Sequence, residues 1–508
     1  MNASKEQAPA GAVEESPARC SQRSARAAHL GLIALLAAAA MLVQGYHPGL
    51  EDDAFYLAAI KKNLHPGLFP HDSDFFRVQF QATVFDKLIA LFIRLTHLPV
   101  GWGVLLWQFA SIFLILWGCW AISRRCFRQV HAQWAAVAMV AFVLNLPVGG
   151  IGLTLVDQYL HPRALATAAI VGAIVATLDR RRGMAALLLG LAFTVHALMA
   201  SFGLSFCLFL GWERRPRYSR ALALALPLGW VFEPGGDAWR QAAVTRPFYH
   251  LRDWQWYEWL GVFGPLVLLW AFRLIARRNG SAVLERLAGR LLAFGIFQLV
   301  VGLAIMLSPG MERLWPLEPM RFLHLVYLLL FLIGGGLIGQ YVLGKHIYRA
   351  LLLFVPLALG MFYAERQMFS ATEHFEWPGA TSRNCWVQAF AWISKNTPAD
   401  SQFAIDPYYM ALPGEDYHGF RALAERSVLA DYIKDAGMVA RVPRLAARWQ
   451  AEVDAQRDWQ HFRAADFERL KNRFGVDWLV LARQPANSDA AGLPCPYRNG
   501  QVLVCRVE

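Results

Sequence analysis

Charged residues are scarce in this chain: Asp, Glu, Lys and Arg make up 17% of its 508 residues, while 56% are hydrophobic. A soluble chain of this length carries more charge and needs less apolar surface to build a core. The 7 cysteines are too few for a disulfide framework and show no metal-ligand spacing. These scarcities exclude a disordered chain, a fibrous chain and an ordinary cytosolic enzyme. They indicate a protein that crosses a membrane several times.

Several motifs that would identify a chemistry are also missing. The sequence has no HExxH element, no CxxC pair, no phosphate-binding glycine loop with Lys and no Gly-x-Ser-x-Gly element. Gly334, Gly336 and Gly339 match the spacing of a dinucleotide-binding motif, but they lie in an apolar run with no strand before them. We expect these glycines to allow close helix packing. The cofactor therefore stays unknown, because neither a nucleotide motif nor a metal motif is present.

Apolar runs recur along the first 364 residues and predict the membrane segments. A full span needs about 20 residues, so several of the runs require cover from neighbouring helices. The first run has a long polar start and no cleavage site after it, so we predict an uncleaved span rather than a signal peptide. The runs are 30–43, 103–122, 134–146, 164–178, 184–210, 221–232, 260–272, 291–307, 322–341 and 351–363.

Basic clusters between these runs predict the orientation. A net charge of +12 would suggest nucleic-acid binding in a soluble protein. Here the cations gather in short clusters, so we expect no nucleic-acid partner and place the clusters in the cytoplasm. The run 184–210 has such clusters at both ends and should therefore enter and return as two short helices that meet near His196. This gives about eleven segments in the inner (plasma) membrane, with the N-terminus cytoplasmic and the C-terminus extracytoplasmic. The clusters are 124–128, 180–182, 214–220, 273–290 and 345–349.

The predicted fold class is an α-helical polytopic membrane protein with a small C-terminal α/β extracytoplasmic domain. Three regions are expected: a cytoplasmic segment 1–26, a transmembrane domain 27–364 whose first extracytoplasmic loop covers 45–99, and the tail 365–508. In the tail, hydrophobic periodicity predicts helices at 386–394, 447–458 and 464–474, and strands at 402–405, 476–481 and 501–507.

Two cysteines flank the last predicted hairpin of the tail. A three-residue turn at 499–501 would place Cys495 opposite Cys505. Because the extracytoplasmic compartment is oxidising, we predict a disulfide between them.

Three consecutive carboxylates, Glu51, Asp52 and Asp53, follow the first span directly. Carboxylates beside a bilayer need hydration, a partner or a function. One interpretation is a helix N-terminus, where acidic residues face the positive end of the helix dipole. That interpretation leaves the further polar residues of the loop, among them His65 and His71, without an explanation. Residues 84–94 then predict an amphipathic helix on the membrane surface.

The pattern Asp52-Asp53-x-x-Tyr56, after a first span and before interfacial helices, resembles the GT-C glycosyltransferase superfamily. Many members have Asp-Glu-x-x-Tyr, so the second acid departs from the usual pattern. The resemblance covers residues 27–364. It implies a polytopic enzyme whose partners are the lipid bilayer, a polyprenyl-phosphate-linked sugar and an acceptor that the sequence does not identify. The tail resembles extracytoplasmic domains of bacterial polytopic proteins, which implies no activity.

Sugar transfer from a phosphate donor assigns roles to the outer loops. It needs a base near the acceptor hydroxyl and cations or hydrogen-bond donors near the leaving phosphate. We take Asp52 as the base and Asp53 as the acceptor-binding or supporting acid. A divalent cation held by Asp52, Asp53 and Asp157 stays open. The candidate substrate-binding residues are Glu51, Tyr56, His65, His71, Asp157, His161, Arg163, Arg246, Arg252 and Arg321.

Two other functions stay open at this point. A transporter or channel would bury ionisable groups in the middle of its spans, whereas here the carboxylates gather at the outer interface. A non-catalytic scaffold with GT-C architecture would have no use for Asp52 and Asp53. The arginines also have simpler explanations, because interfacial anchoring or a solvated loop would account for them.

Overall fold

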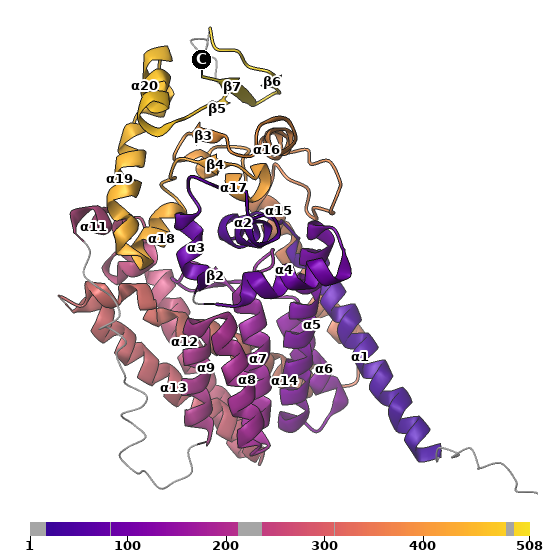
Figure 1. Cartoon of the computed structure of the whole chain (residues 1–508). Helices are drawn as coiled ribbons and strands as arrows, with labels where there is room; N and C mark the ends of the chain where they lie inside the picture. Colours follow the sequence, from indigo (N-terminus) through magenta and orange to yellow (C-terminus); the bar gives the residue numbers. More distant parts are fainter. Residues whose placement is uncertain (1–16, 82, 212–235, 309, 484–491, 508) are drawn as a thin grey trace, which may run out of the picture.

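Apolar helices form one end of the molecule, and the sheet of the tail forms the other (Figure 1). The structure is a computed structural model that describes residues 17–81, 83–211, 236–308, 310–483 and 492–507. Within these residues, six helices are long and apolar enough to cross a membrane. They are Arg26–Gln44, Val100–Cys126, Trp256–Arg278, Ala282–Leu307, Glu312–Leu343 and Ile347–Met368.

The predicted apolar runs inside the described residues are helical over most of their length; the run 134–146 leaves the helix after Ala141. Helix is the expected conformation, because an apolar surrounding requires each backbone group to find its partner within the segment. The run 221–232 lies outside the described residues, so the total of about eleven segments stays a prediction. The apolar helices are α1 (Pro17–Gln44), α5 (Val100–Cys126), α6 (Val130–Ala141), α7 (Pro162–Leu178), α8 (Arg182–Val195), α9 (Ala197–Gly211), α12 (Trp256–Arg278), α13 (Ala282–Leu307), α14 (Phe322–Ile338) and α15 (Ile347–Met368).

Two local predictions about these helices are confirmed. The run 184–210 breaks at His196, where α8 ends and α9 begins. Gly336 and Gly339 sit where helices approach closely: an added Cβ would lie 2.1 Å from the Phe127 ring at the first and 2.5 Å from the Ala135 Cβ at the second. Gly336 and Gly339 therefore allow the end of α14 and η6 (Gly339–Leu343) to approach Phe127 and α6 closely, whereas a Cβ at Gly334 would meet the Phe272 ring at an ordinary 3.4 Å.

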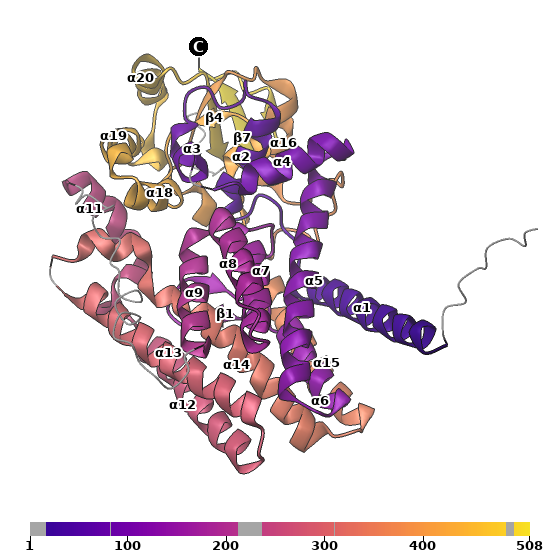
Figure 2. The same ribbon diagram turned by 60° about the horizontal axis from the view of Figure 1, so that its bottom comes forward.

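The first loop is also helical and lies between the helix bundle and the tail (Figures 1 and 2). It contains α2 (Asp53–Leu64), α3 (Asp74–Gln81) and α4 (Phe85–Thr96). On α4, Phe85 and Ile89 are buried while Leu91 and Leu95 are exposed, so the predicted amphipathic helix is present with an apolar outer face. The other short elements of the helical part are β1 (Pro147–Val148), β2 (Leu153–Thr154), α11 (Asp237–Val244), η2 (Pro247–Tyr249), η3 (Leu251–Asp253), η4 (Glu312–Leu317), η5 (Pro319–Arg321) and η6 (Gly339–Leu343).

The tail is a five-stranded sheet with helices around it. The strand order is β4-β3-β5-β7-β6; β3 pairs in parallel with β4 and β5, and β7 pairs antiparallel with β5 and β6. Each predicted helix and strand of the tail is found within a few residues of its expected bounds. The tail elements are α16 (Cys385–Asn396), β3 (Gln402–Ile405), η7 (Tyr409–Ala411), α17 (Phe420–Ala424), β4 (Ser427–Val428), α18 (Asp435–Arg441), η8 (Pro443–Leu445), α19 (Ala446–Ala455), η9 (Trp459–His461), α20 (Ala464–Phe474), β5 (Trp478–Ala482), β6 (Tyr497–Arg498) and β7 (Val502–Arg506).

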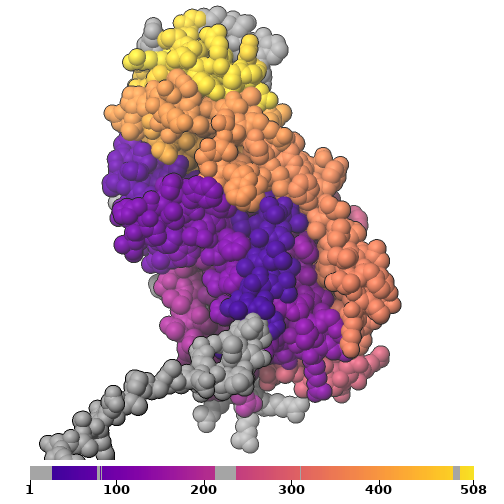
Figure 3. Space-filling model, turned by 90° about the vertical axis from the view of Figure 1, so that its right-hand side faces the viewer, coloured from indigo at the N-terminus to yellow at the C-terminus, as the bar shows by residue number. Residues whose placement is uncertain are grey.

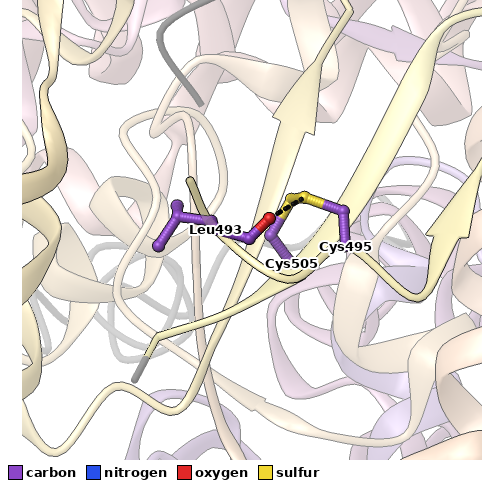
Figure 4. The surroundings of a disulfide bond; sticks show 3 residues. All are labelled: Leu493, Cys495 and Cys505. Atoms are coloured by element: carbon purple, nitrogen blue, oxygen red, sulfur yellow. Dashed lines mark hydrogen bonds between the residues drawn. A yellow bond between two sulfur atoms is a disulfide. The ribbon is translucent and has the colours of Figure 1, made fainter. Parts of the chain in front are cut away.

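The last hairpin differs from its predicted register by one residue. Arg498 pairs with Leu503, so the turn is one residue longer than expected, and Cys495 is not directly opposite Cys505. The two cysteines are nevertheless joined by a disulfide, shown in Figure 4. The side chains bridge the offset because Cys495 precedes the paired residues of β6 and can turn toward the neighbouring strand.

The tail is seated directly on the first loop (Figure 3). Tail residues from Ala422 to Val453 belong to the same hydrophobic core as the helical part, whereas separate clusters cover the two faces of the sheet. Ion pairs cross the same junction: Lys61 Nζ lies 2.6 Å from Glu425 Oε1, and Arg421 Nε lies 2.5 Å from Asp72 Oδ2. The tail and the first loop therefore form one packed unit.

A buried chain of histidines and glutamates adds to this junction. His47 Nε2 lies 2.6 Å from Glu365 Oε1 at the end of α15, and His47 Nδ1 lies 2.9 Å from Glu376 Oε1. Glu376 also contacts His418 Nε2 of the tail at 3.0 Å, and Glu365 also binds His374. Burial opposes the charge on His47, but its hydrogen bonds to the two glutamates outweigh that effect and raise its pKa to about 9.

This raised pKa predicts a loss of stability at alkaline pH. The His47 contribution is fully present below the unfolded pKa near 6.5 and is lost as the pH rises through about 9. The shift corresponds to roughly 3 kcal/mol. We expect the unfolding temperature of the purified protein to fall between pH 7 and pH 10, and His47→Gln to flatten that dependence. The exposed His461 supplies the matched control, since His461→Gln should leave the profile unchanged. A profile that is identical for His47→Gln and the unmodified protein would contradict the assignment.

Candidate functional site

A cavity of about 840 Å³ lies where the first loop, the helical part and the tail meet. Its walls come from the start of α2, the β1–β2 hairpin with the segment after it, residues 246–258, the start of α14, and α18. Part of the wall is aromatic, with Phe248, Trp254 and Tyr257 on it. The ionisable residues on the wall are Glu51, Asp52, Tyr56, Asp157, Tyr159, Arg163, Arg246, Tyr249, Asp253, Tyr257, Glu258, Glu318, Arg321, Tyr327, Lys434 and Arg441.

Asp52 directly precedes α2 and lines the cavity. It occupies the N-cap position, yet its side chain makes no capping hydrogen bond. Its backbone N–H donates to the Tyr159 hydroxyl at 3.3 Å. Its side chain is 35% exposed. The helix-start interpretation therefore does not account for this carboxylate.

Two neighbours decide the charge of Asp52. Lys434 Nζ donates to Oδ1 at 3.0 Å, and His161 Nε2 lies 3.9 Å from Oδ2. Burial opposes the ionised form, but the Lys434 ammonium and the His161 ring outweigh it and hold the Asp52 pKa well below its usual range. Asp52 is therefore a carboxylate at neutral pH, able to accept a proton or a hydrogen bond.

A neutral His161 ring faces Asp52, at a distance longer than a hydrogen bond. Its Nδ1 accepts the backbone N–H of Arg163 at 2.9 Å, which assigns the ring proton to Nε2, the nitrogen that faces Asp52. Burial and the Arg163 charge lower the His161 pKa, so the ring stays uncharged. The Tyr56 ring meets the His161 ring edge-on at 4.7 Å, and the His196 ring stacks on it at 6.1 Å. The break between α8 and α9 thus packs beside the site.

Asp53 has a different position from the one we expected. Its side chain is buried and accepts the Gly49 backbone N–H at 2.7 Å, and it does not line the cavity. Burial raises its pKa to about 7. This geometry assigns Asp53 to the turn that precedes α2 rather than to acceptor binding.

Three of the four predicted arginines reach the cavity wall. Arg163 binds Asp157 at 2.5 and 2.6 Å, Arg321 pairs with Glu318 at 2.6 Å, and Arg246 donates to the carbonyl oxygens of Ile433 and Lys434. Arg163 is 2% exposed, yet its Nε and Nη1 have no hydrogen-bond partner within the described residues, and neither does Arg246 Nε. Buried N–H groups normally find a partner, so these atoms mark unused hydrogen-bonding capacity behind the cavity wall.

The remaining candidates are divided between the cavity and the surface. Glu51 lines the cavity and binds Lys434. Arg252 and His65 are exposed and do not line it. His71 also lies away from it, with its Nε2 3.0 Å from the carbonyl oxygen of Asp400. These three positions were expected at the site only because they share its loops.

Two cations of the site were missed, and both belong to the tail. Lys434 precedes α18, and Arg441 ends it, 3.2 Å from Glu318 Oε1. Arg421 holds the start of α18 in place, because its guanidinium binds both carboxylate oxygens of Asp435 at 2.8 and 2.9 Å. No local pattern in the tail marks these residues. Their role follows only from the contact with the first loop.

Four carboxylates of the cavity wall, Glu51, Asp52, Asp157 and Glu318, are engaged by cations. Asp157 is bound by Arg163, Glu318 by Arg321 and Arg441, and Glu51 and Asp52 share Lys434. Across the described part of the chain, no group of three or more His, Cys, Asp or Glu residues could hold a metal ion. The three aspartates considered as metal ligands do not converge on one point.

Comparison with known proteins gives little. No protein-family model and no curated protein match the chain. Among solved structures, it is similar to the apo oligosaccharyltransferase of Archaeoglobus fulgidus, at 12% identity over 89% of this chain and 69% of that chain, with a TM-score of 0.48. A second similar structure is AglB of the same organism, in complex with an inhibitory peptide and a dolichol-phosphate, at 12% identity, the same coverage and a TM-score of 0.45. Likenesses of this size do not establish a shared activity.

Proposed function

We propose that this protein is a GT-C type glycosyltransferase that moves a sugar from a polyprenyl-phosphate donor to an acceptor at the outer face of the plasma membrane. The observation that carries the proposal is the cavity itself. It combines an ionised carboxylate, Asp52, with the guanidinium groups of Arg163 and Arg246 on its wall. The remaining support comes from the orientation of the helices and from the apolar rim of the cavity.

The orientation of the helices favours an extracytoplasmic cavity. α7, α12 and α14 each begin at the cavity wall, with Arg163, Tyr257 and Arg321 near their first turns. Each leads away from the cavity toward a basic cluster: 180–182, Arg277–Arg278 and 345–349 respectively. By the positive-inside rule these clusters are cytoplasmic. A helix of the length of α12 spans roughly 35 Å, enough to cross the hydrocarbon core. The N-terminus then lies in the cytoplasm and the tail outside.

The rim of the cavity suits a lipid-linked donor. α12 contributes Tyr257, Glu258 and Gly261 to the wall, and on the same helix Leu260 and Val267 are 60% and 61% exposed. A polyprenyl chain could therefore follow α12 while its phosphate enters the polar cavity. Such a division between a buried head and an exposed apolar track is what an amphiphilic substrate needs.

The reaction follows from the charges. The acceptor hydroxyl attacks the anomeric carbon, its proton passes to an Asp52 oxygen, and the bond from carbon to the phosphate oxygen breaks. The leaving phosphate gains negative charge, which the guanidinium donors stabilise. The Nε2–H of His161 faces the carboxylate from 3.9 Å and favours its charged form electrostatically. Sugar, acceptor and lipid length are not defined by these contacts.

Donor binding tests the proposal most directly. We expect purified protein in detergent to retain a C55 polyprenyl monophosphate in native mass spectra and not to retain the matching polyprenol. Arg246→Gln should weaken that binding by about 10–100-fold, the loss of one or two charge-assisted hydrogen bonds. This substitution leaves no carboxylate unpaired, because Arg246 binds only backbone carbonyl oxygens.

Arg252 provides the control, since it comes from the same segment but is exposed and lies outside the cavity. Arg252→Gln should bind the phospholipid as the unmodified protein does. Equal retention of polyprenol and its phosphate, or equal losses in the two variants, would count against a phosphate site here.

A further inference from the structure

We propose that the Lys434 ammonium is the built-in counter-cation of this site, so that transfer does not depend on a divalent metal. The inference rests on the proposed function. Lys434 Nζ hydrogen-bonds to Glu51 and to Asp52, the two adjacent carboxylates that open into the cavity. One positive charge, contributed by the tail, therefore lies between the two carboxylates.

The carboxylates near Lys434 and the three aspartates of the metal hypothesis do not fit a divalent cation alongside this ammonium. Mg²⁺ and Ca²⁺ need about six oxygen ligands, usually with several carboxylates among them. Glu51 and Asp52 face the same ammonium, Asp157 is bound at both oxygens by Arg163, and Asp53 is tied to the Gly49 backbone. A second cation between Glu51 and Asp52 would meet the ammonium at close range and be repelled by it.

Lys434 is also held in place by its own backbone. Its N–H donates to Asp431 Oδ1 at 2.5 Å, and the next N–H, of Asp435, donates to the same oxygen at 3.2 Å. Asp435 in turn accepts the Asp431 N–H at 3.0 Å and binds Arg421 through both oxygens. This closed turn fixes the Cα of Lys434, and the side chain is only 8% exposed. A positioned charge of this kind needs no reorganisation when negative charge develops.

The ammonium can contact carboxylate and donor at the same time. It carries three N–H donors, of which Glu51 and Asp52 take two. The third can reach a phosphate oxygen in the cavity while the other two keep Asp52 oriented. During transfer, the Asp52 carboxylate loses its negative charge as it takes up the proton, and the leaving phosphate gains negative charge. The ammonium lies between these two groups.

Manganese binding and activity together test this inference. Purified full-length protein, treated with EDTA and then given Mn²⁺, should show no bound Mn²⁺ by electron paramagnetic resonance. Its transfer activity should change less than twofold with EDTA. Lys434→Met should reduce transfer about 10²-fold with no recovery in Mn²⁺. Lys434→Glu removes the ammonium, directs a third carboxylate toward Glu51 and Asp52, and should gain a Mn²⁺ site.

Lys61→Met is the matched control, because Lys61 also joins the first loop to the tail, through Glu425 and the carbonyl oxygen of Ala422, but lies outside the cavity. It should keep activity and gain no Mn²⁺ site. Mn²⁺ bound by the unmodified protein and lost in Asp52→Asn, activity abolished by EDTA, or no Mn²⁺ site in a folded Lys434→Glu protein would each overturn the inference. The resonance measurement needs no substrate, so it decides the inference even if the protein transfers no sugar and the proposed function fails.

Discussion

Sugar transfer should fall by about 10²–10⁴-fold in Asp52→Asn, the usual effect of removing a general base. Asn keeps the shape and one acceptor oxygen, but it cannot take the proton of the acceptor hydroxyl. The substitution should not disturb folding, because Asp52 makes no capping hydrogen bond and Asn is as good a residue at a helix start. Lys434 keeps Glu51 as its partner. The measurement is transfer of label from a polyprenyl-phosphate sugar in membranes, at matched expression.

The neighbouring aspartate gives an internal control for this experiment. Asp53 accepts the Gly49 N–H, and the side-chain oxygen of Asn can accept the same hydrogen bond. Asp53→Asn should therefore keep activity within a few-fold of normal while carrying the same replacement of a carboxyl group by an amide. Normal activity in Asp52→Asn, or equal losses in both variants, would remove Asp52 from the role of base.

Arg421→Met should lower the free energy of unfolding by about 3–5 kcal/mol, the cost of leaving buried charges without their partner. Arg421 is 4% exposed and binds Asp72 of the first loop and Asp435 of the tail. Burial raises the pKa of Asp435 to about 7, although Arg421 opposes that shift, so without the guanidinium this carboxyl would take up a proton or lose its place. The measurement is denaturant unfolding in mixed micelles, followed by tryptophan fluorescence.

An exposed arginine of the tail serves for comparison. Arg457 pairs with Asp454 on the surface, and Arg457→Met should change stability by less than about 1 kcal/mol. If Arg421→Met were as mild as Arg457→Met, the buried pairs would not hold the tail on the loop. Because Asp435 adjoins Lys434, Arg421→Met should also reduce transfer in the fraction that stays folded.

The helices could be predicted because an apolar run is recognisable from a short stretch of the sequence alone. The run 164–178 became α7, and the tail strand Gln402–Ile405 was expected at the same residues. The hairpin near Cys505 was placed one residue out of register, since turn length depends on contacts that a short pattern does not contain.

The site was only half predictable, for a similar reason. Asp52 and Asp53 are alike in the sequence, but successive helix positions point about 100° apart, so one side chain enters the cavity and the other is buried in the turn before α2. Lys434 and Asp52 are 382 residues apart, and nothing near Lys434 marks it. Only the docking of the tail brings it to the site.

The sequence separation of Asp52 and Lys434 also determines when the site can form during protein synthesis. Translation proceeds at about 5–20 residues per second, so the 382 residues between Asp52 and Lys434 take roughly 20–80 s to synthesise. During that interval the carboxylates at the start of α2 have left the ribosome without the cation that will neutralise them. A chain that lacks the tail, or whose tail stays on the cytoplasmic side, would have Asp52 without Lys434, and under the proposed function we expect it to transfer no sugar.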